Sequence, residues 1–317
     1  MVSQFRGFQS DGADGADGAD GADGADGADG AGGSGRVSGV AGRRSPLLAQ
    51  ALLSTQGGIT LGYTGIGNSP NLDRTALARN LGRWSADVRG HMYDFELMNG
   101  VTFDSSTAAS ASLKNAAGGI IATLNQPDYE TTDQKLRDEL LKVFQKAALR
   151  PDRMNEILTQ VQVPYAFFAM VLNLQPGRHR YTFELMSCVF RFATLTGMQF
   201  KNHFNVRRPA DRSPLIQPVL LTPGHSSYPG GHAIQCHFVA ATLNKLLARN
   251  ADRDDELVKL ADRISENRVV AGLHYPEDMT KGKDLGIALA TYFDAKRQVA
   301  GSALKWLWDL AKIELST

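Results

Sequence analysis

Apolar residues recur every three or four positions along most of the chain beyond residue 45, which is the spacing of one face of an α-helix. The segment 131–150 shows this most clearly, because a threonine start signal precedes a single stripe formed by Leu136, Leu140, Val143, Phe144 and Ala147. The segment 181–200 is apolar nearly all round, which predicts a buried central helix.

The same periodicity predicts further helices in 72–98, 153–162, 232–249, 253–272 and 279–298. Alternation of apolar and polar residues is scarce, and only short strand candidates such as 57–63 show it. We therefore expect an all-α fold, a bundle of about eight to ten helices.

The first 45 residues differ from the rest in composition. Residues 11–31 read as seven Asp-Gly-Ala triplets, and a glycine-rich stretch follows them. Such a segment buries too little apolar surface to offset the entropy of ordering, and it lacks the spacing of a calcium-binding loop. We expect a disordered low-complexity arm over 1–45 and a single α-helical catalytic domain over 46–317.

Charge changes this picture once the arm is set aside. The net charge of the chain is +1, but without the seven triplet aspartates 34 basic residues face 26 acidic ones, a balance of +8. A mildly basic domain suits a small anionic ligand, whereas a basic stripe with interleaved aromatic residues, typical of nucleic-acid binding, is absent from the sequence.

Cellular context follows from three further observations. Cys188 and Cys236 lie in helical patterns and are expected to be buried thiols. The N-terminus carries no apolar leader, and the longest apolar patch, 164–174, is too short to span a bilayer. The sequence therefore predicts a cytoplasmic protein that acts on small molecules without a membrane or nucleic-acid partner, and it leaves homo-oligomerisation open.

Candidate chemistry concentrates in the C-terminal third of the chain. The residues concerned are Lys201, Arg208, Pro209, Pro229, Gly230, Gly231, His232, Arg268, His274 and Asp278. Three cations and a glycine turn that opens an apolar helix are suited to an oxyanion, because a helix N-terminus presents free amides. Lys201 and Arg208 lie seven apart, two helical turns, so we expect them to point the same way. His274 and Asp278 lie four apart, close enough for the carboxylate to orient the imidazole.

These blocks, read as K-x6-RP, P-x-G-H and R-x5-H-x3-D, resemble the signature shared by vanadium-dependent haloperoxidases and PAP2-type acid phosphatases. The resemblance covers roughly residues 200–290 and implies the helical bundle of that superfamily. One departure is Gly230, where the family usually has serine. A serine hydroxyl there would donate one hydrogen bond to the anion, worth about 1–3 kcal/mol.

The resemblance also implies a role for each residue. His274 would be the metal ligand, axial to vanadium, or the nucleophile toward phosphorus, with Asp278 orienting it. His232 would be the general acid or base, and Lys201 would polarise the bound oxyanion. The oxyanion would be held by Lys201, Arg208, Gly230, Gly231 and Arg268. His225 occupies a place where bromide-oxidising members carry histidine, which makes it a candidate halide-site residue.

Two reactions share these groups. The first is that of a vanadium-dependent, bromoperoxidase-like haloperoxidase, which needs orthovanadate, hydrogen peroxide, a halide and an organic acceptor. The alternative is a soluble PAP2-type acid phosphatase that cleaves a phosphomonoester through a phosphohistidine. A non-catalytic phosphate-binding protein is a third reading. The place of His225 and the lack of an export signal favour the haloperoxidase.

Overall fold

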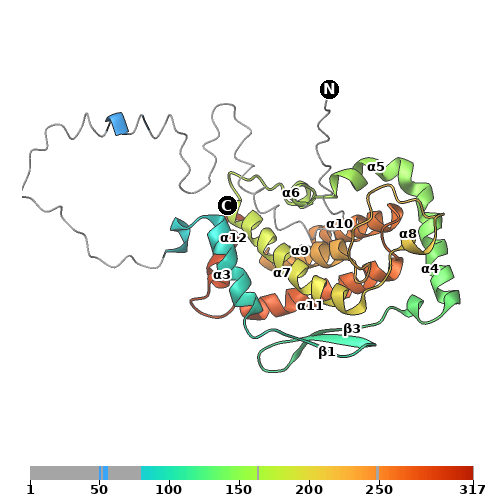
Figure 1. The fold of residues 1–317 in the computed structure, drawn as a ribbon. Helices are drawn as coiled ribbons and strands as arrows, with labels where there is room; N and C mark the ends of the chain where they lie inside the picture. Colours follow the sequence, from blue (N-terminus) through green and yellow to red (C-terminus); the bar gives the residue numbers. More distant parts are fainter. Residues whose placement is uncertain (1–49, 51–52, 56–79, 163, 248–249, 317) are drawn as a thin grey trace, which may run out of the picture.

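The computed structural model describes residues 50, 53–55, 80–162, 164–247 and 250–316. The Asp-Gly-Ala arm, the strand candidate 57–63 and the first part of the predicted helix 72–98 lie outside these residues. The described part is mostly helical (Figure 1). Its α-helices are α3 (Ala86–Met98), α4 (Asp133–Lys146), α5 (Arg150–Thr159), α6 (Tyr165–Leu172), α7 (Arg180–Phe204), α8 (Pro209–Arg212), α9 (Gly231–Leu246), α10 (Ala251–Val270), α11 (Pro276–Lys296) and α12 (Ala303–Glu314).

The centre of the molecule is α9, with the long helices α7, α10 and α11 packed around it. α9 packs against α7, α10 and α11, and α11 makes its most extensive contacts with α9. Gly282 and Gly286 of α11 permit this close approach, because a Cβ on Gly282 would lie 2.5 Å from the Gly230 carbonyl oxygen and one on Gly286 would lie 2.5 Å from that of Ile234. The core is therefore built around α9, whose side chains are buried on nearly every face.

The ends of α7 and α11 follow local signals. α7 ends at Phe204, where Asn205 adopts the left-handed conformation that asparagine tolerates. α11 begins with Pro276, whose missing amide proton costs nothing in a first turn. The predicted helices 181–200 and 279–298 correspond to these two elements. α12 has no predicted counterpart, although Leu304, Leu307 and Trp308 are buried at helical spacing.

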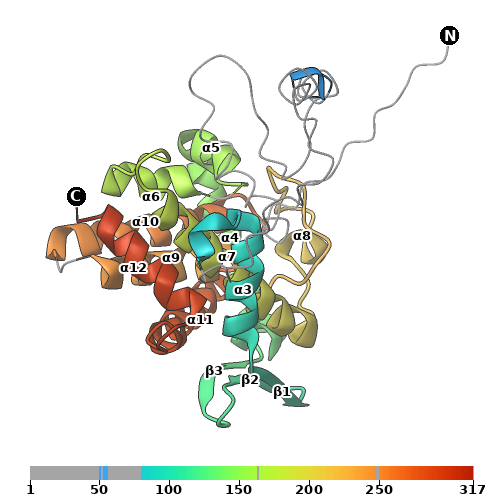
Figure 2. The ribbon, with the colours of Figure 1, turned by 90° about the vertical axis from the view of Figure 1, so that its left-hand side faces the viewer.

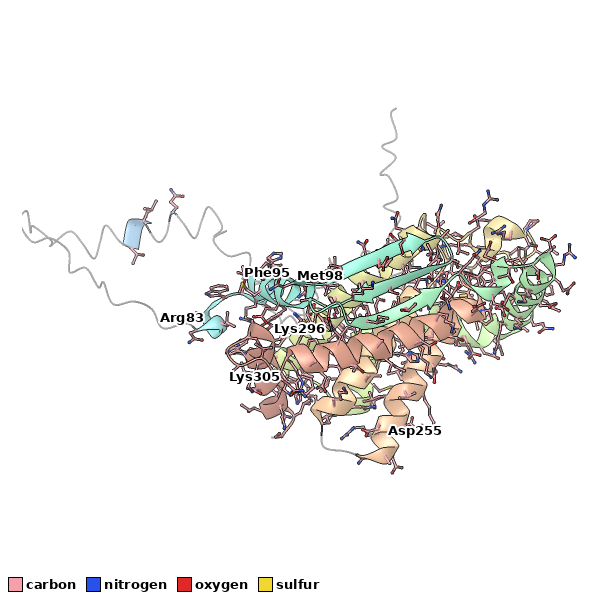
Figure 3. The ribbon with its side chains drawn as sticks, turned by 90° about the horizontal axis from the view of Figure 1, so that it is seen from below. Arg83, Phe95, Met98, Asp255, Lys296 and Lys305 are labelled. Carbon is pink, nitrogen blue, oxygen red and sulfur yellow. The ribbon has the colours of Figure 1, made fainter. Side chains whose placement is uncertain are left out.

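A three-stranded antiparallel sheet departs from the all-α prediction. Its strands are β1 (Thr102–Thr107), β2 (Ser110–Lys114) and β3 (Ile120–Asn125), in the order β1-β2-β3. Ala111 and Leu113 alternate with more exposed residues on β2, and β3 contacts α11. Figure 3 shows the strands lying along α11, and Figure 2 shows them at one end of the helical body, below α3.

Shorter elements complete the described chain. Three 3-10 helices are η3 (Leu81–Arg83), η4 (Asp128–Glu130) and η5 (Ala147–Leu149). Among the residues that the structure describes, none of the helices has the length and apolarity needed to cross a bilayer. Both cysteines are buried free thiols.

Candidate functional site

His274, in the turn between α10 and α11, forms a buried pair with Asp278 in the first turn of α11. Both side chains are fully buried, and His274 Nδ1 lies 3.0 Å from Asp278 Oδ2. Gly272, at φ +84°, adopts a conformation that favours glycine and so lets the chain leave α10. Because a carboxylate oxygen only accepts, the Nδ1 atom carries the proton and Nε2 offers its lone pair.

The Asp278 carboxylate is held in place by four hydrogen-bond donors. Tyr129 Oη lies 2.6 Å from Oδ1, and Oδ2 accepts from Ser227 Oγ at 2.6 Å and from the Tyr275 amide at 3.0 Å, in addition to His274. Burial alone would raise the pKa of Asp278, but the hydrogen bonds from His274, Ser227 and Tyr129 lower it below the ordinary value. The carboxylate is therefore ionised and fixed in orientation.

Tyr129 reaches Asp278 because the end of β3 is anchored on α11. The Glu277 carboxylate accepts hydrogen bonds from the backbone amides of Asp128, at 2.9 and 3.1 Å, and of Tyr129 at 3.4 Å. The ring of Tyr129 also packs on that of Tyr275, with centroids 4.3 Å apart. The short helix η4, which follows β3, thus delivers a donor to the site from 149 positions away in the chain.

Lys201 and Arg208 meet at the loop before α9, although not for the expected reason. α7 ends at Phe204, and Arg208 stands in extended conformation before α8, so the two residues do not share a helix face. Lys201 Nζ donates to the carbonyl oxygens of Ser226, at 2.8 Å, and Ser227, at 3.1 Å, and Arg208 Nη2 lies 3.4 Å from that of Ser226. The prediction of a shared helix face was wrong, but the cations do share a carbonyl.

The guanidinium of Arg208 connects His274 with His225. Nη1 lies 3.3 Å from His274 Nε2 and donates to the Leu273 carbonyl at 3.0 Å. Nη2 lies 3.3 Å from His225 Nδ1, while Nε donates to the His225 carbonyl at 3.0 Å. Arg208 is 1% exposed and His225 is half-buried. A cleft of about 450 Å³ opens beside them, lined by 205–208, Asp211 and 222–226.

Arg268 and His232 are both held through Gln160, the residue that ends α5. Arg268 Nη2 donates to the Ile157 carbonyl at 3.0 Å and lies 3.5 Å from Gln160 Oε1. His232 Nε2 lies 2.9 Å from the Gln160 carbonyl oxygen, which can only accept, so Nε2 carries the proton in this arrangement. Arg268 and His232 are almost completely buried, in the last turn of α10 and the first turn of α9.

The space beside Gly230 is filled by Met279. A Cβ on Gly230 would lie 2.0 Å from Met279 Cε and 3.1 Å from the Asp278 carbonyl oxygen, which accepts from the Gly230 amide at 2.9 Å. A serine at this position therefore requires the methionine side chain to move. Gly231 begins α9, where the first-turn amides have no partner within the helix.

Sequence reasoning missed four residues of this arrangement: Tyr129, Gln160, Ser227 and Met279. Ser227 had a local signal, because it lies in the same loop as His225, two residues along the chain. Tyr129 and Gln160 lie far from the motif in the sequence, and packing brings them to it. Met279 directly follows Asp278, but nothing in the sequence indicates that its side chain fills the space beside Gly230.

The donor set suits an oxyanion better than a bare metal ion. In the described ranges, no cluster of three or more histidine, cysteine, aspartate or glutamate side chains is arranged to hold a metal ion. Lys201, Arg208 and Arg268 are instead buried cations. Arg208 lies 3.3 Å from His274 Nε2, and Lys201 lines the same small cavity as Gly231 at the start of α9. Comparison with protein-family models and with curated proteins gives no match for this chain.

Proposed function

We propose that this protein is a vanadium-dependent haloperoxidase that oxidises bromide, built on the helical bundle of that superfamily. One observation carries the proposal. His274 has its Nδ1 atom held by the buried Asp278 carboxylate at 3.0 Å, and its Nε2 atom faces the Arg208 guanidinium at 3.3 Å. An imidazole lone pair is thus presented beside a buried cation, as binding of an anionic centre requires.

The residues present fit orthovanadate as an anion. Lys201, Arg208 and Arg268 would balance its charge, the first-turn amides of α9 would donate to its oxygens, and His274 Nε2 would bind its central atom. Vanadate, when bound, supplies Lewis-acid activation of hydrogen peroxide toward a halide. The net reaction consumes hydrogen peroxide, bromide and one proton and leaves hypobromous acid and water.

The chain itself supplies orientation, charge and protons. Asp278 keeps the proton of His274 on Nδ1, and Lys201 and Arg208 concentrate negative charge at the centre. His232 is the proton carrier, and transfer from its Nε2 requires release of the Gln160 carbonyl. His225, half-buried beside Arg208 at the cleft, is placed to meet a halide that enters from solvent.

Phosphomonoester hydrolysis is the second candidate, because an unprotonated nitrogen beside a guanidinium is also a nucleophile toward phosphorus. His274 Nε2 would attack phosphorus, the P–O bond to the leaving group would break, and His232 would protonate the departing oxygen. Water would then cleave the phosphohistidine. The halide-site position of His225 supports the peroxidase over this reaction.

The test measures both activities on one preparation. Purified protein is assayed, with and without orthovanadate, for peroxide- and bromide-dependent bromination of a phenolic dye, and in parallel for hydrolysis of an aryl phosphate. We expect bromination only with vanadate, and a loss of at least about 10³-fold in His274→Ala. Hydrolysis without bromination would overturn the peroxidase in favour of the phosphatase. Absence of both activities would leave an anion-binding protein.

His237→Gln is the matched control. His237 is also a buried histidine paired with an aspartate, since its Nε2 atom lies 2.9 Å from Asp262 Oδ1. It faces a different groove, between α10 and α11, and burial lowers its pKa to about 4. Its replacement should leave the specific activity of folded protein within about twofold of the original.

A further inference from the structure

The cleft beside Arg208 shares its inner wall with the proposed reaction centre. Arg208 lines the cleft and also lies 3.3 Å from His274 Nε2, so one guanidinium separates the cleft from the imidazole. His225 lines the same cleft from the loop before α9. A molecule in the cleft therefore lies next to the place where an oxidised halide would form.

The charged side chains of the cleft favour an anion. Arg207 and Arg208 face a single carboxylate there, Asp211, whose Oδ2 atom already accepts the Arg208 amide at 3.1 Å. Asn205 and Thr222 add uncharged polar groups. The lining is thus mainly polar, with an excess of positive charge.

Arg207 differs from the arginines around it, because it has no side-chain partner among the residues that the structure describes. Arg208 is buried and tied to the 225–226 loop, and Arg212 binds Glu130 through Nη2 at 2.7 and 2.8 Å. Arg207 is exposed, and within the described part of the chain it makes neither a hydrogen bond nor an ion pair. An exposed guanidinium at the rim of a positive cleft can bind a planar carboxylate through two hydrogen bonds.

We propose that this cleft takes an organic acceptor with an anionic group, such as a phenol carboxylate, and that Arg207 selects for that group. The assignment rests on the proposed haloperoxidase function. Arg207 binds the carboxylate at the rim, and the ring of the acceptor extends inward toward Arg208 and His225. The ring of the bound acceptor then takes bromine from hypobromous acid before the acid escapes into solvent. A C–Br bond forms, the O–Br and ring C–H bonds break, and the hydroxide and the proton leave as water.

The experiment compares two phenols of nearly equal shape, 4-hydroxybenzoate and 4-hydroxybenzamide, as competing acceptors with vanadate, bromide and hydrogen peroxide. Arg207→Gln should lower the ratio of kcat/KM for the anion to that for the amide by about fivefold, and added salt should shrink the difference between the two proteins. An unchanged ratio overturns the proposal, as expected if free hypobromous acid reacts in bulk solution.

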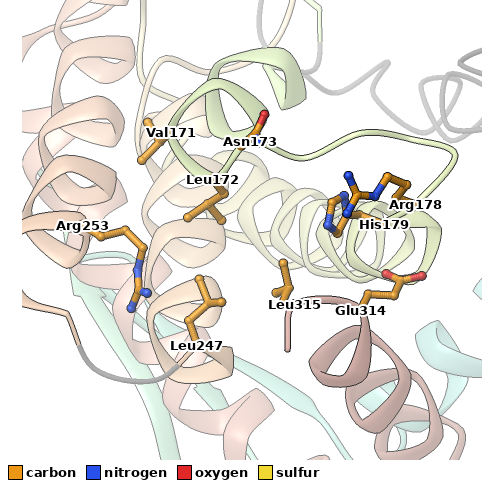
Figure 4. Close-up of a pocket in the computed structure, with 9 residues that line it drawn as sticks. All are labelled: Val171, Leu172, Asn173, Arg178, His179, Leu247, Arg253, Glu314 and Leu315. Carbon is orange, nitrogen blue, oxygen red and sulfur yellow. The ribbon is translucent and has the colours of Figure 1, made fainter. Parts of the chain in front are cut away.

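Arg178→Gln is the matched control, because Arg178 is also an exposed arginine at a pocket. That pocket, of about 340 Å³, lies near the opposite end of α7 and is shown in Figure 4. Arg178→Gln should leave the ratio of kcat/KM for the two acceptors unchanged. An equal drop in both variants would overturn the proposal, because it would show that the preference depends only on the overall surface charge.

A second measurement separates this proposal from the proposed function. Binding of 4-hydroxybenzoate to the vanadate-loaded protein is measured by calorimetry in the absence of peroxide. Arg207→Gln should weaken it about fivefold. If bromide oxidation is absent but this loss is seen, the peroxidase fails and the anion-binding cleft stands. If bromide oxidation is present and binding is unaltered, the selection by Arg207 fails alone.

Discussion

The two ends of α7 bury opposite charges and balance them differently. Glu184 lies near the start of the helix and forms a bidentate ion pair with Arg89 of α3. Arg89 Nε donates to Glu184 Oε1 at 2.7 Å, and Nη2 donates to Oε2 at 2.6 Å. Tyr93 donates to the same carboxylate at 2.8 Å, and the rings of Trp306 and Tyr181 lie beside the guanidinium. Each charge at this end is neutralised by a side-chain partner.

Lys201 lies near the other end of α7, 17 residues after Glu184 and so about 26 Å away along the helix axis. Its ammonium donates to backbone carbonyls, and Arg208 shares the Ser226 carbonyl. Asp278 is the buried carboxylate of this region, and its oxygens are directed to His274, Ser227 and Tyr129. Lys201 lies in the last turn of α7, where the helix dipole favours a cation.

This difference distinguishes a structural ion pair from a site suited to binding an added anion. The Arg89–Glu184 pair is complete within the protein, so its expected role is to fix α3 on α7. The Lys201 end brings buried cations together around an imidazole lone pair, so an added anion would lower its electrostatic energy. Removing the charge of the buried carboxylate should therefore lower mainly the stability at the Glu184 end and mainly the activity at the Lys201 end.

The largest contrast is expected from removing the charge of each buried carboxylate. Glu184→Gln leaves the Arg89 charge buried without its partner and should lower the free energy of unfolding by about 3–5 kcal/mol, with little change in specific activity. Asp278→Asn removes the acceptor that fixes the His274 tautomer and should lower kcat by about 10³-fold or more. Urea unfolding and steady-state kinetics measure the two effects. Equal loss of specific activity in both variants would contradict the assignment of a structural role to Glu184 and a role in the reaction to Asp278.

An intermediate effect is expected from adding an anion. Orthovanadate at one hundred times its Kd should stabilise the protein by about 2.7 kcal/mol, because it binds only the folded state. Lys201→Met should lose most of this increment, whereas Arg89→Met should keep it despite a lower starting stability. Thermal unfolding with and without the anion provides the measurement. A full increment in Lys201→Met would show that the lysine does not contribute to anion binding.

The smallest effect is expected from removing one hydroxyl at each end. Tyr129→Phe and Tyr93→Phe each delete one hydrogen bond to a buried carboxylate and should cost about 1.5–3 kcal/mol. Only Tyr129→Phe should also raise the pKa of Asp278, since its hydrogen bond is among the causes that lower that pKa.

The sign of the pH effect follows from that depressed pKa. Asp278 contributes stability above the unfolded pKa of about 3.9, and this is lost as pH falls through the lower folded value. In Tyr129→Phe the contribution at neutral pH should be smaller, and the acid limb of the activity profile should move upward by less than about one pH unit. An acid limb that moves equally in Tyr93→Phe would contradict the assignment.

Local relations in the chain were the part of the site that could be predicted. His274 and Asp278 are separated by four residues, and a turn followed by a helix brings such residues together in almost any fold. The long helices were predictable for a similar reason, because apolar residues at helical spacing report burial of one face. Residues 181–200 and α7 agree closely on this basis.

Relations between distant segments were not predictable. Tyr129 reaches Asp278 only because Glu277 captures the turn after β3, and the sheet itself showed weak alternation. Lys201 and Arg208 meet through the Ser226 carbonyl although a helix end lies between them. Met279 occupies the space beside Gly230, which no spacing in the motif indicates.

The amino-acid sequence alone specified the residue types of the proposed oxyanion site, their order and the helices that hold them, since these depend on contacts within a few residues. Tertiary packing decided which groups orient the catalytic candidates. Tyr129, Ser227 and Gln160 act through hydrogen bonds to positions between 47 and 149 residues away. It also decided how the two buried charges of α7 are balanced. Glu184 pairs with Arg89 of α3, whereas Lys201 donates to carbonyls of the loop before α9. The electrostatic energy of a buried charge depends on the groups that pack around it, and those groups come together only when the chain folds.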